Sequence, residues 1–340
     1  MSIDLTGIAN KNEFFTQHYL ATYFEDVVKE KAKAWKDAAK DGAVSNPAAE
    51  LGRLRQTYQR ARVSFDEAAS EARRCELTAE NAVRVLAALG FPEAALPQVA
   101  YESGDPAPVW REFLAADGTP QVWVALALEP RGGDEGVFSA QPLDPAGLTP
   151  AMATADEDAL ESLVDALFFR TPEPARFVLV LTMGHILLCD RNKWAEKRCL
   201  DIDLREVLAR KTEDAAATLL AYDCLCPQGA PLMDELDAQS SRNAAEVSGA
   251  LKYALRECVE MLGNEVLYDW VHNKGRAVEE MDAGELTTEC LRYMYRILFL
   301  LFMEARPELG FAPMKSDSYL KGYSFEALRD LVADLGEGVD

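Results

Sequence analysis

Residues 176–190 of the chain read RFVLVLTMGHILLCD. Two runs of large apolar residues flank the pair Met183-Gly184, and short apolar runs bounded by turn residues are typical of buried strands. A glycine between two such runs favours a tight turn. We therefore predict adjacent strands over 176–182 and 185–190, joined around Met183-Gly184.

Three shorter segments upstream have the same texture. They are rich in Val, Trp, Phe and Tyr, are separated by Gly, Pro and Asp, and span 98–102, 109–114 and 121–128. We interpret them as three successive strands. A loop rich in Gly and Pro follows over 130–150, and then a helix near 156–169. The predicted order is helix, three strands, helix and two strands.

Helical periodicity dominates both ends of the chain. After a capping Asn12, the apolar positions of a first helix recur every fourth residue, at Phe15, Tyr19, Tyr23 and Val27. A second helix starts at Asn46-Pro47 and a third spans about 78–90. Beyond Asp203 we predict helices over 204–209, 214–224, 238–262, 267–271 and 284–304. The segment 289–304 is apolar on most sides, which is typical of the central helix of a bundle.

These elements predict an α+β protein. Helices of residues 1–95 pack with a small restriction-endonuclease-like mixed sheet in residues 96–226, and an all-α helical connector bundle occupies residues 237–340. The boundary is expected in 226–236, where Pro, Gly and acidic residues cluster.

The net charge of the 340-residue chain is −22. This charge excludes a bare basic nucleic-acid binder, and the even spread of apolar residues excludes a wholly disordered chain. Nearly all of the excess acid falls in residues 101–340, whereas the stretch 29–74 holds eleven basic against seven acidic residues. That stretch fits contacts with phosphates or with an acidic partner, but it also fits an ordinary solvated helix surface.

Cysteine usage and hydropathy indicate the compartment. The seven cysteines are an odd number without repeated C-x-x-C spacing, as expected for reduced thiols in a cytoplasm. The most apolar run, 297–303, is far shorter than the roughly 20 residues needed to cross a bilayer, and no basic segment followed by an apolar one opens the sequence. We therefore expect a cytoplasmic protein with no membrane partner.

The predicted order of elements matches that of the restriction-endonuclease-like nuclease core, in which carboxylates near the second and third strands hold a divalent metal. Asp105 precedes the second strand, and the third ends in Glu129-Pro130-Arg131. If the site is active, we expect Asp105 and Glu129 to bind Mg²⁺ and Arg131 to replace the usual lysine as the third catalytic residue. Arginine stays protonated, so an acidic loop at a strand end is the competing interpretation.

Other chemistry-bearing residues are less specific. Further carboxylates lie in the 130–150 loop and before the next helix, at Asp134, Glu135, Asp144, Asp156, Glu157 and Asp158. The last three also fit the positive end of a helix dipole. The histidines, His18, His185 and His272, are too isolated in sequence to predict a metal cluster. No phosphate loop, Rossmann fingerprint, serine elbow or adenine-gripping Asn-Pro-Pro-Tyr is present.

Several stretches together resemble the N-terminal region of large phage-defence proteins, namely the adenine-specific DNA methyltransferases of the type IIG kind and their relatives in the BREX and DISARM systems. The stretches are NKNEFFTQHYL (10–20), RFVLVL (176–181) with HILLCDRNKW (185–194) and LDIDL (200–204), LRYMYRILFLLFMEAR (291–306) and GYSFEALR (322–329). In that family a nuclease-like domain and a helical connector precede the methyltransferase. The resemblance implies that this chain is an N-terminal fragment or a split subunit, with S-adenosylmethionine bound only in the domain that is missing here.

Two functions from different classes follow. The first is a DNA-acting module of a restriction or defence complex, which binds double-stranded DNA and other subunits. Its expected phosphate contacts are Lys31, Lys33, Lys36, Arg53, Arg55 and Arg60. The second is an acidic protein-interaction subunit, a scaffold or DNA mimic without enzymatic activity, which the charge of residues 101–340 favours.

Overall fold

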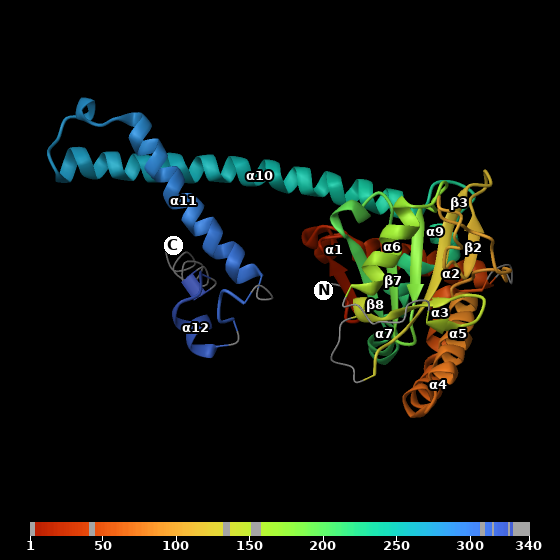
Figure 1. Cartoon of the computed structure of the whole chain (residues 1–340). Coiled ribbons are helices and arrows are strands. Elements are labelled where there is room, and N and C mark those ends of the chain that lie inside the picture. The colour runs from red at the N-terminus through yellow and green to blue at the C-terminus, as the bar shows by residue number, and fades with distance from the viewer. Residues whose placement is uncertain are drawn as a thin grey trace. The chain divides into compact units, whose positions relative to one another are not determined.

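A computed structural model describes residues 4–40, 45–131, 137–150, 158–306, 310–314, 316–325 and 327–328 (Figure 1). The chain divides into two compact units, Met1–Ala244 and Ala245–Asp340. The first unit contains a mixed sheet covered by helices, and the second is helical. The α+β class with a C-terminal helical region is therefore confirmed. The division falls within a long helix, later in the chain than the 226–236 segment where we expect it.

The sheet of the first unit has eight strands. Its order is β1-β8-β7-β6-β3-β4-β5, and β2 pairs with β3 beside this path. The strands are β1 (Ile8–Lys11), β2 (Arg111–Leu114), β3 (Pro120–Leu128), β4 (Gln141–Asp144), β5 (Thr149–Pro150), β6 (Phe177–Leu181), β7 (His185–Asp190) and β8 (Cys199–Asp203). β3 and β6 are parallel, with Val122 opposite Phe177, and the other pairs are antiparallel. The carboxyl ends of β3 and β6 therefore meet at one edge of the sheet.

Helices cover both faces of this sheet. They are α1 (Gln17–Thr22), α2 (Phe24–Lys40), α3 (Pro47–Arg53), α4 (Arg55–Glu67), α5 (Glu71–Ala88), α6 (Ala159–Phe169), α7 (Leu204–Arg210), α8 (Glu213–Leu220) and α9 (Tyr222–Leu225). Because side chains alternate along a strand, the central strands bury apolar residues on both faces. Leu179 joins the core beneath α1–α5 and α7–α9, whereas Val178 and Val180 pack with α6 on the opposite face.

The strands over 176–182 and 185–190 are confirmed as β6 and β7, and those over 109–114 and 121–128 as β2 and β3. The strand expected over 98–102 is wrong, because this segment forms only an isolated bridge between Ala100 and Pro106. β4 and β5 lie within the segment interpreted as a loop, and β1 and β8 were not expected as strands. β1 and β8 pair with each other although they lie far apart in the sequence, and β4 and β5 each contain a proline.

Two of the three predicted N-terminal helices start at residues other than those expected from the sequence. Asn12 does not cap the first helix, because it lies at φ 51° in the turn after β1. Thr16 is the cap instead, and its hydroxyl accepts a hydrogen bond from the Tyr19 N–H. Asn46 does cap α3 as expected, with Pro47 in the first turn. The third helix begins earlier than expected, after Ser70, and is followed by Gly90 at φ +83°.

The second unit contains most of α10 (Leu232–Tyr268), followed by α11 (Ala283–Ala305) and α12 (Asp317–Gly322). The first turns of α10 belong to the first unit, where Met233 and Leu236 are buried. In α11 only Cys290 is buried, whereas Tyr295 and Phe299 are 69% and 50% exposed. The expectation that 289–304 forms the buried centre of a bundle is therefore wrong for the residues described here. None of the helices described is both long enough and apolar enough to cross a membrane.

Candidate functional site

The C-terminal end of β3 opens into a polar cavity of about 430 Å³ at the edge of the sheet. Glu129 and Arg131, which the sequence pattern singles out, both line it. The turn between β6 and β7 and the end of β8 contribute Gly184, His185 and Asp203. Helices α4 and α5 close it from the side, with the residues Tyr58, Arg62, Asp66 and Arg74. Arg205 of α7 lies on the far side, so the cavity collects residues from helices and strands spread between Tyr58 and Arg205.

Asp105 lies elsewhere. It is exposed in the loop before β2, where its carboxylate accepts a hydrogen bond from the Ser103 hydroxyl at 2.9 Å, and it does not line the cavity. The described part of the chain contains no cluster of three or more His, Cys, Asp or Glu side chains suited to a metal ion. The residues present therefore do not fit the Mg²⁺ site expected from Asp105 and Glu129.

The alternative carboxylates supply no substitute. Asp134, Glu135, Asp156 and Glu157 lie outside the described residues. Asp144 ends β4 and accepts a hydrogen bond from the Ala146 N–H at 3.2 Å. Asp158 occupies the position before α6 without a side-chain capping bond.

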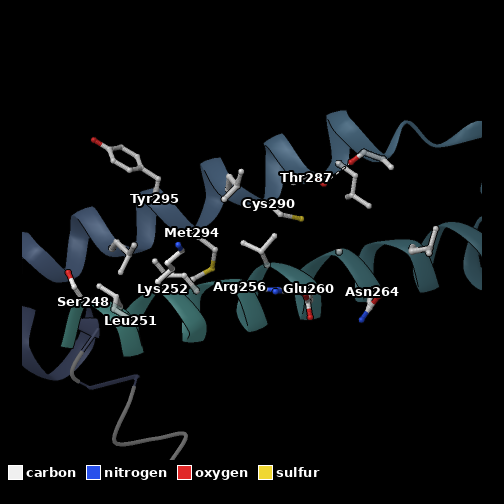
Figure 2. Close-up of a pocket in the computed structure, with 18 residues that line it drawn as sticks. Ser248, Leu251, Lys252, Arg256, Glu260, Asn264, Thr287, Cys290, Met294 and Tyr295 are labelled. Atoms are coloured by element: carbon white, nitrogen blue, oxygen red, sulfur yellow. Dashed lines mark hydrogen bonds and ion pairs between the residues drawn. The ribbon is translucent and has the colours of Figure 1, made fainter. Parts of the chain in front are cut away.

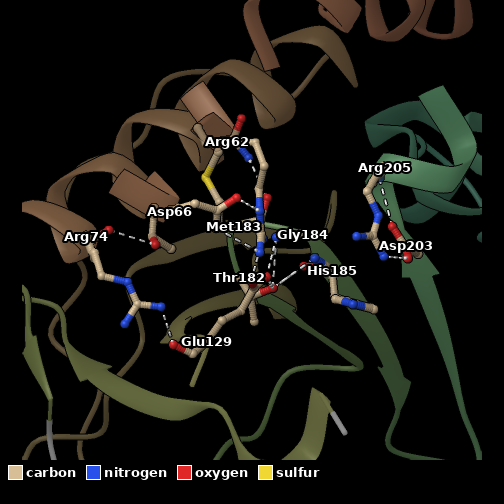
Figure 3. Close-up of polar contacts among 12 residues, drawn as sticks. Arg62, Asp66, Arg74, Glu129, Thr182, Met183, Gly184, His185, Asp203 and Arg205 are labelled. Carbon is tan, nitrogen blue, oxygen red and sulfur yellow. Dashed lines mark hydrogen bonds and ion pairs between the residues drawn. The ribbon is translucent and has the colours of Figure 1, made fainter. Parts of the chain in front are cut away.

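The Glu129 carboxylate is held by three donors. Arg62 donates at 2.5 Å, the Thr182 hydroxyl at 2.8 Å, and the Gly184 N–H also donates to it (Figure 3). A Cβ at position 184 would lie 2.9 Å from the Glu129 Oε1 atom, so a larger residue here would displace the carboxylate. Burial opposes ionisation, but the Arg62 charge and these hydrogen bonds outweigh it and lower the pKa of Glu129. Glu129 therefore acts here as an ionised tie between β3 and the β6–β7 turn.

Two further guanidinium groups line the cavity without a carboxylate partner among the described residues. Arg74 is buried at 6% exposure, stacks on the Phe65 ring at 4.4 Å and donates to the main-chain carbonyl of Glu129 at 2.8 Å. Arg131 is exposed and donates to the carbonyls of Ala68 and Ala69, both at 3.1 Å. Burial and the nearby Arg131 charge lower the pKa of Arg74.

The cavity also contains a histidine that is paired with an aspartate, His185 with Asp201. His185 Nδ1 is 2.8 Å from Asp201 Oδ1. Although burial disfavours the charged ring, the hydrogen bond and charge of Asp201, with the charges of Asp203 and Glu129, raise the pKa of His185. Asp203 caps α7 and lies 3.6 Å from the Arg205 guanidinium. The register that places His185 opposite Asp203 brings these groups together, and it could not be read from the spacing of histidines alone.

Tyr58 supplies an unusual polar group. Its side chain is 4% exposed and lines the cavity from α4. Its hydroxyl is buried and has no hydrogen-bond partner among the described residues. Burial raises the pKa of this phenol, so the hydroxyl stays protonated and available as a donor.

The basic residues expected to contact DNA separate into two groups. Lys31 forms an ion pair with Asp223 at 2.9 Å, and Arg55 binds Glu213 and the Leu208 carbonyl, so both tie helices together. Lys33 and Lys36 are exposed on α2 and make no ion pair with any described residue. Lys36 also lines a shallow depression of about 370 Å³ with Arg53 and Lys211. We call Lys33, Lys36, Arg53 and Lys211 the basic surface.

Arg60, the sixth expected contact, does not belong to this surface. It is exposed on α4 and lines neither of the depressions beside α2. Arg53 itself forms an ion pair with Glu50, one turn earlier on α3. Asp37 and Asp214 lie in the same depressions as the lysines, so the local excess of positive charge is modest.

The second unit carries an apolar groove between α10 and α11. Its volume is about 960 Å³, and Leu251, Cys290 and Met294 are among the side chains that line it (Figure 2). Polar side chains such as Lys252, Arg256 and Glu260 also line it. A surface of this kind is typical of a protein interface.

The chain was compared with models of protein families, with curated proteins and with solved structures. None of the three comparisons finds a match. The cavity, the basic surface and the apolar groove therefore carry the functional argument.

Proposed function

We propose that the chain is the nuclease-like and helical connector region of a bacterial restriction-modification or phage-defence DNA methyltransferase, and that it acts in DNA binding or assembly. The family assignment comes from the sequence resemblance. The DNA-binding role is supported by one observation, that Lys33, Lys36 and Lys211 have no ion-pair partner among the described residues of a chain with net charge −22. Free cations on one surface are the groups that contact phosphates.

We assign no hydrolytic step to the chain. A metal-dependent nuclease needs carboxylate oxygens free to bind the ion. Glu129 instead accepts hydrogen bonds from Arg62, Thr182 and Gly184. Methyl transfer, and with it S-adenosylmethionine, is assigned to a different domain or subunit. All cysteines are free thiols, which supports a reducing, cytoplasmic location.

Binding to a short DNA duplex at increasing salt tests the DNA role. Three phosphate contacts give a slope of about −2.7 in a plot of log K against log salt, so affinity should fall about 40-fold between about 50 and 200 mM. Fluorescence anisotropy of a labelled duplex measures this directly. Absence of binding even at the lowest salt would remove the DNA role.

Incubation with supercoiled and linear DNA in Mg²⁺ or Mn²⁺ tests the absence of hydrolysis. We expect both DNA forms to remain intact. Cleavage that disappears in both Asp105→Ala and Glu129→Ala would instead restore the two-carboxylate nuclease site. Asp105 is exposed, so its substitution leaves the fold unchanged and makes it the cleaner of the two variants.

A second candidate function is that of a protein-interaction subunit. It is favoured by the exposed apolar side chains of α11, including Leu291, Tyr295 and Phe299. Large exposed apolar side chains gathered on one element mark interaction sites more often than free surface. Size-exclusion chromatography of the chain mixed with a purified candidate subunit tests this, with Phe299→Ser as the disrupting variant. A chain that stays monomeric and elutes separately from every candidate would remove this function.

A further inference from the structure

We propose that the cavity at the carboxyl ends of β3 and β6 binds a phosphate monoester, either on a nucleotide or at the 5′ end of a nucleic acid. The groups that would contact it are the Tyr58 hydroxyl, the guanidinium groups of Arg74, Arg131 and Arg205, and His185. This site is distinct from the basic surface on α2 and α3 and does not depend on it.

The balance of charges in the cavity favours an anion. Arg62 is neutralised by Glu129 and by Asp66, which lies 3.2 Å from it. Arg74 and Arg131 have no carboxylate partner among the described residues, and their charges are close enough to repel each other. A bound dianion would relieve this repulsion. Planar guanidinium groups also match the geometry of phosphate oxygens.

The Tyr58 hydroxyl provides an independent indication of a ligand. Buried polar groups in folded proteins nearly always have a hydrogen-bond partner, and a donor without one needs an explanation. Tyr58 lines the same cavity as Arg62, Glu129, Asp203 and Arg205, and the charges of these four groups act on its phenol. A phosphate oxygen would accept the hydrogen bond that the protein leaves unmade.

His185 and Arg205 add two further hydrogen-bond donors to the cavity. In Figure 3, His185 lies between the Glu129 cluster and the pair formed by Asp203 and Arg205. Asp201 holds the Nδ1 side of the ring, which leaves Nε2 as the atom available to a ligand. Arg205 is 70% exposed and only loosely paired, so it is free to turn toward a bound anion.

The size and composition of the cavity set the class of ligand. A volume of about 430 Å³ is in the range of small-molecule sites and accommodates a phosphate with part of its nucleoside. The set is rich in donors, and its best-placed carboxylate, Glu129, is already occupied. The chemistry therefore favours a bound phosphate that carries its own negative charge, without a bridging metal.

Titration calorimetry with three probes tests the proposal: inorganic phosphate, adenosine monophosphate, and one oligonucleotide compared with and without its 5′ phosphate. We expect at least one monoester to bind, and the 5′-phosphorylated strand to bind at least about tenfold more tightly than its 5′-hydroxyl form if the source is a nucleic-acid end. Comparable affinity for adenosine monophosphate would identify a nucleotide instead. Failure of all three probes would overturn the proposal.

Two variants locate the binding within the cavity. Tyr58→Phe removes only the unpartnered hydroxyl, and Arg131→Ala removes an exposed guanidinium that otherwise donates only to two carbonyls, so both should fold. Each should weaken monoester binding about tenfold or more, because each removes a hydrogen bond to a charged ligand. Unchanged affinity in both would place the ligand elsewhere. The double variant Lys33→Ala/Lys36→Ala is the matched control and should keep full monoester affinity even where duplex binding is lost.

Discussion

Arg62 on α4 and Glu129 after β3 form an ion pair at 2.5 Å across 67 residues of sequence. The carboxylate is 13% exposed and the guanidinium 30%, so water screens the pair only in part. The pair joins the helical layer to the end of a central strand. Glu129, which the sequence pattern predicts to be a metal ligand, therefore forms a structural ion pair with Arg62 instead.

Replacing Arg62 tests this tie. Arg62→Ala leaves Glu129 partly buried without its compensating charge, and we expect it to lower the free energy of unfolding by about 2 kcal/mol. Adding Glu129→Gln should recover part of the loss, because the double variant no longer buries an unpaired charge. Urea denaturation of the two single variants and the double variant measures the coupling.

Arg60→Ala is the matched control for this cycle. Arg60 lies on the same helix, is exposed and forms no ion pair with a described residue. Its substitution should change stability by less than about 0.5 kcal/mol. Strictly additive losses for Arg62 and Glu129 would show that the ion pair contributes nothing.

His185 predicts a pH dependence of stability. Asp201 and its acidic neighbours raise the folded-state pKa of His185 above the unfolded value of about 6.5. Protonation therefore favours the folded state, and this contribution is complete below about pH 6.5 and is lost as pH rises through the folded pKa. The stability difference between the native protein and His185→Asn should be larger at about pH 5.5 than at about pH 8.5.

Denaturation curves at both pH values measure that difference. Asp201→Asn is the companion variant, because it keeps the imidazole but removes the carboxylate that raises its pKa. It should diminish the same pH-dependent contribution. An equal loss at both pH values in His185→Asn would show that the histidine acts only through packing.

The strands that could be predicted are those that carry their own signal. The runs FVLVL and HILLCD form β6 and β7 because continuous apolar residues are buried on both faces of a central sheet. β8, with the sequence CLDID, alternates apolar and acidic residues, and β4, with QPLD, contains a proline. These segments become strands because a neighbouring strand supplies their hydrogen-bond partners. A single sequence does not reveal which segment that neighbouring strand is.

The same distinction separates the cavity residues that the sequence could predict from those that it could not. Glu129 and Arg131 could be selected because they follow a predicted strand within three residues of each other. Arg62 and Tyr58 lie one helical turn apart on α4, about 70 residues earlier, and only the packing of α4 against the sheet edge brings them to Glu129. The pairing of His185 with Asp201 likewise depends on the register of β7 with β8.

Thiol reactivity offers a simple test of burial. All cysteines except Cys258 are buried. Burial raises the pKa of Cys226 to about 12, and burial together with contact with Cys199 raises that of Cys189. Because the thiolate is the reactive form, we expect one fast-reacting thiol in the native protein.

Labelling with a maleimide, followed by mass spectrometry, counts the fast thiols. Cys258→Ser should abolish the fast phase, and Cys290→Ser, a buried position in the same unit, should leave it unchanged. All seven thiols should react after denaturation. Two or more fast thiols in the native chain would contradict the packing described for the sheet or for α11.

The basic surface gives the sharpest prediction for DNA. Lys33→Ala/Lys36→Ala removes two exposed cations without breaking a described ion pair, so stability should change by less than about 1 kcal/mol. Each lost phosphate contact should reduce the salt slope by about 1, and duplex affinity should fall uniformly across sequences. Lys31→Ala, by contrast, breaks the ion pair with Asp223 and should act mainly on stability. Arg60 is the one expected phosphate contact outside the basic surface that forms no ion pair among the described residues. If the double variant keeps the full salt slope while Arg60→Ala reduces it, the DNA-contacting surface lies on α4 and not on α2.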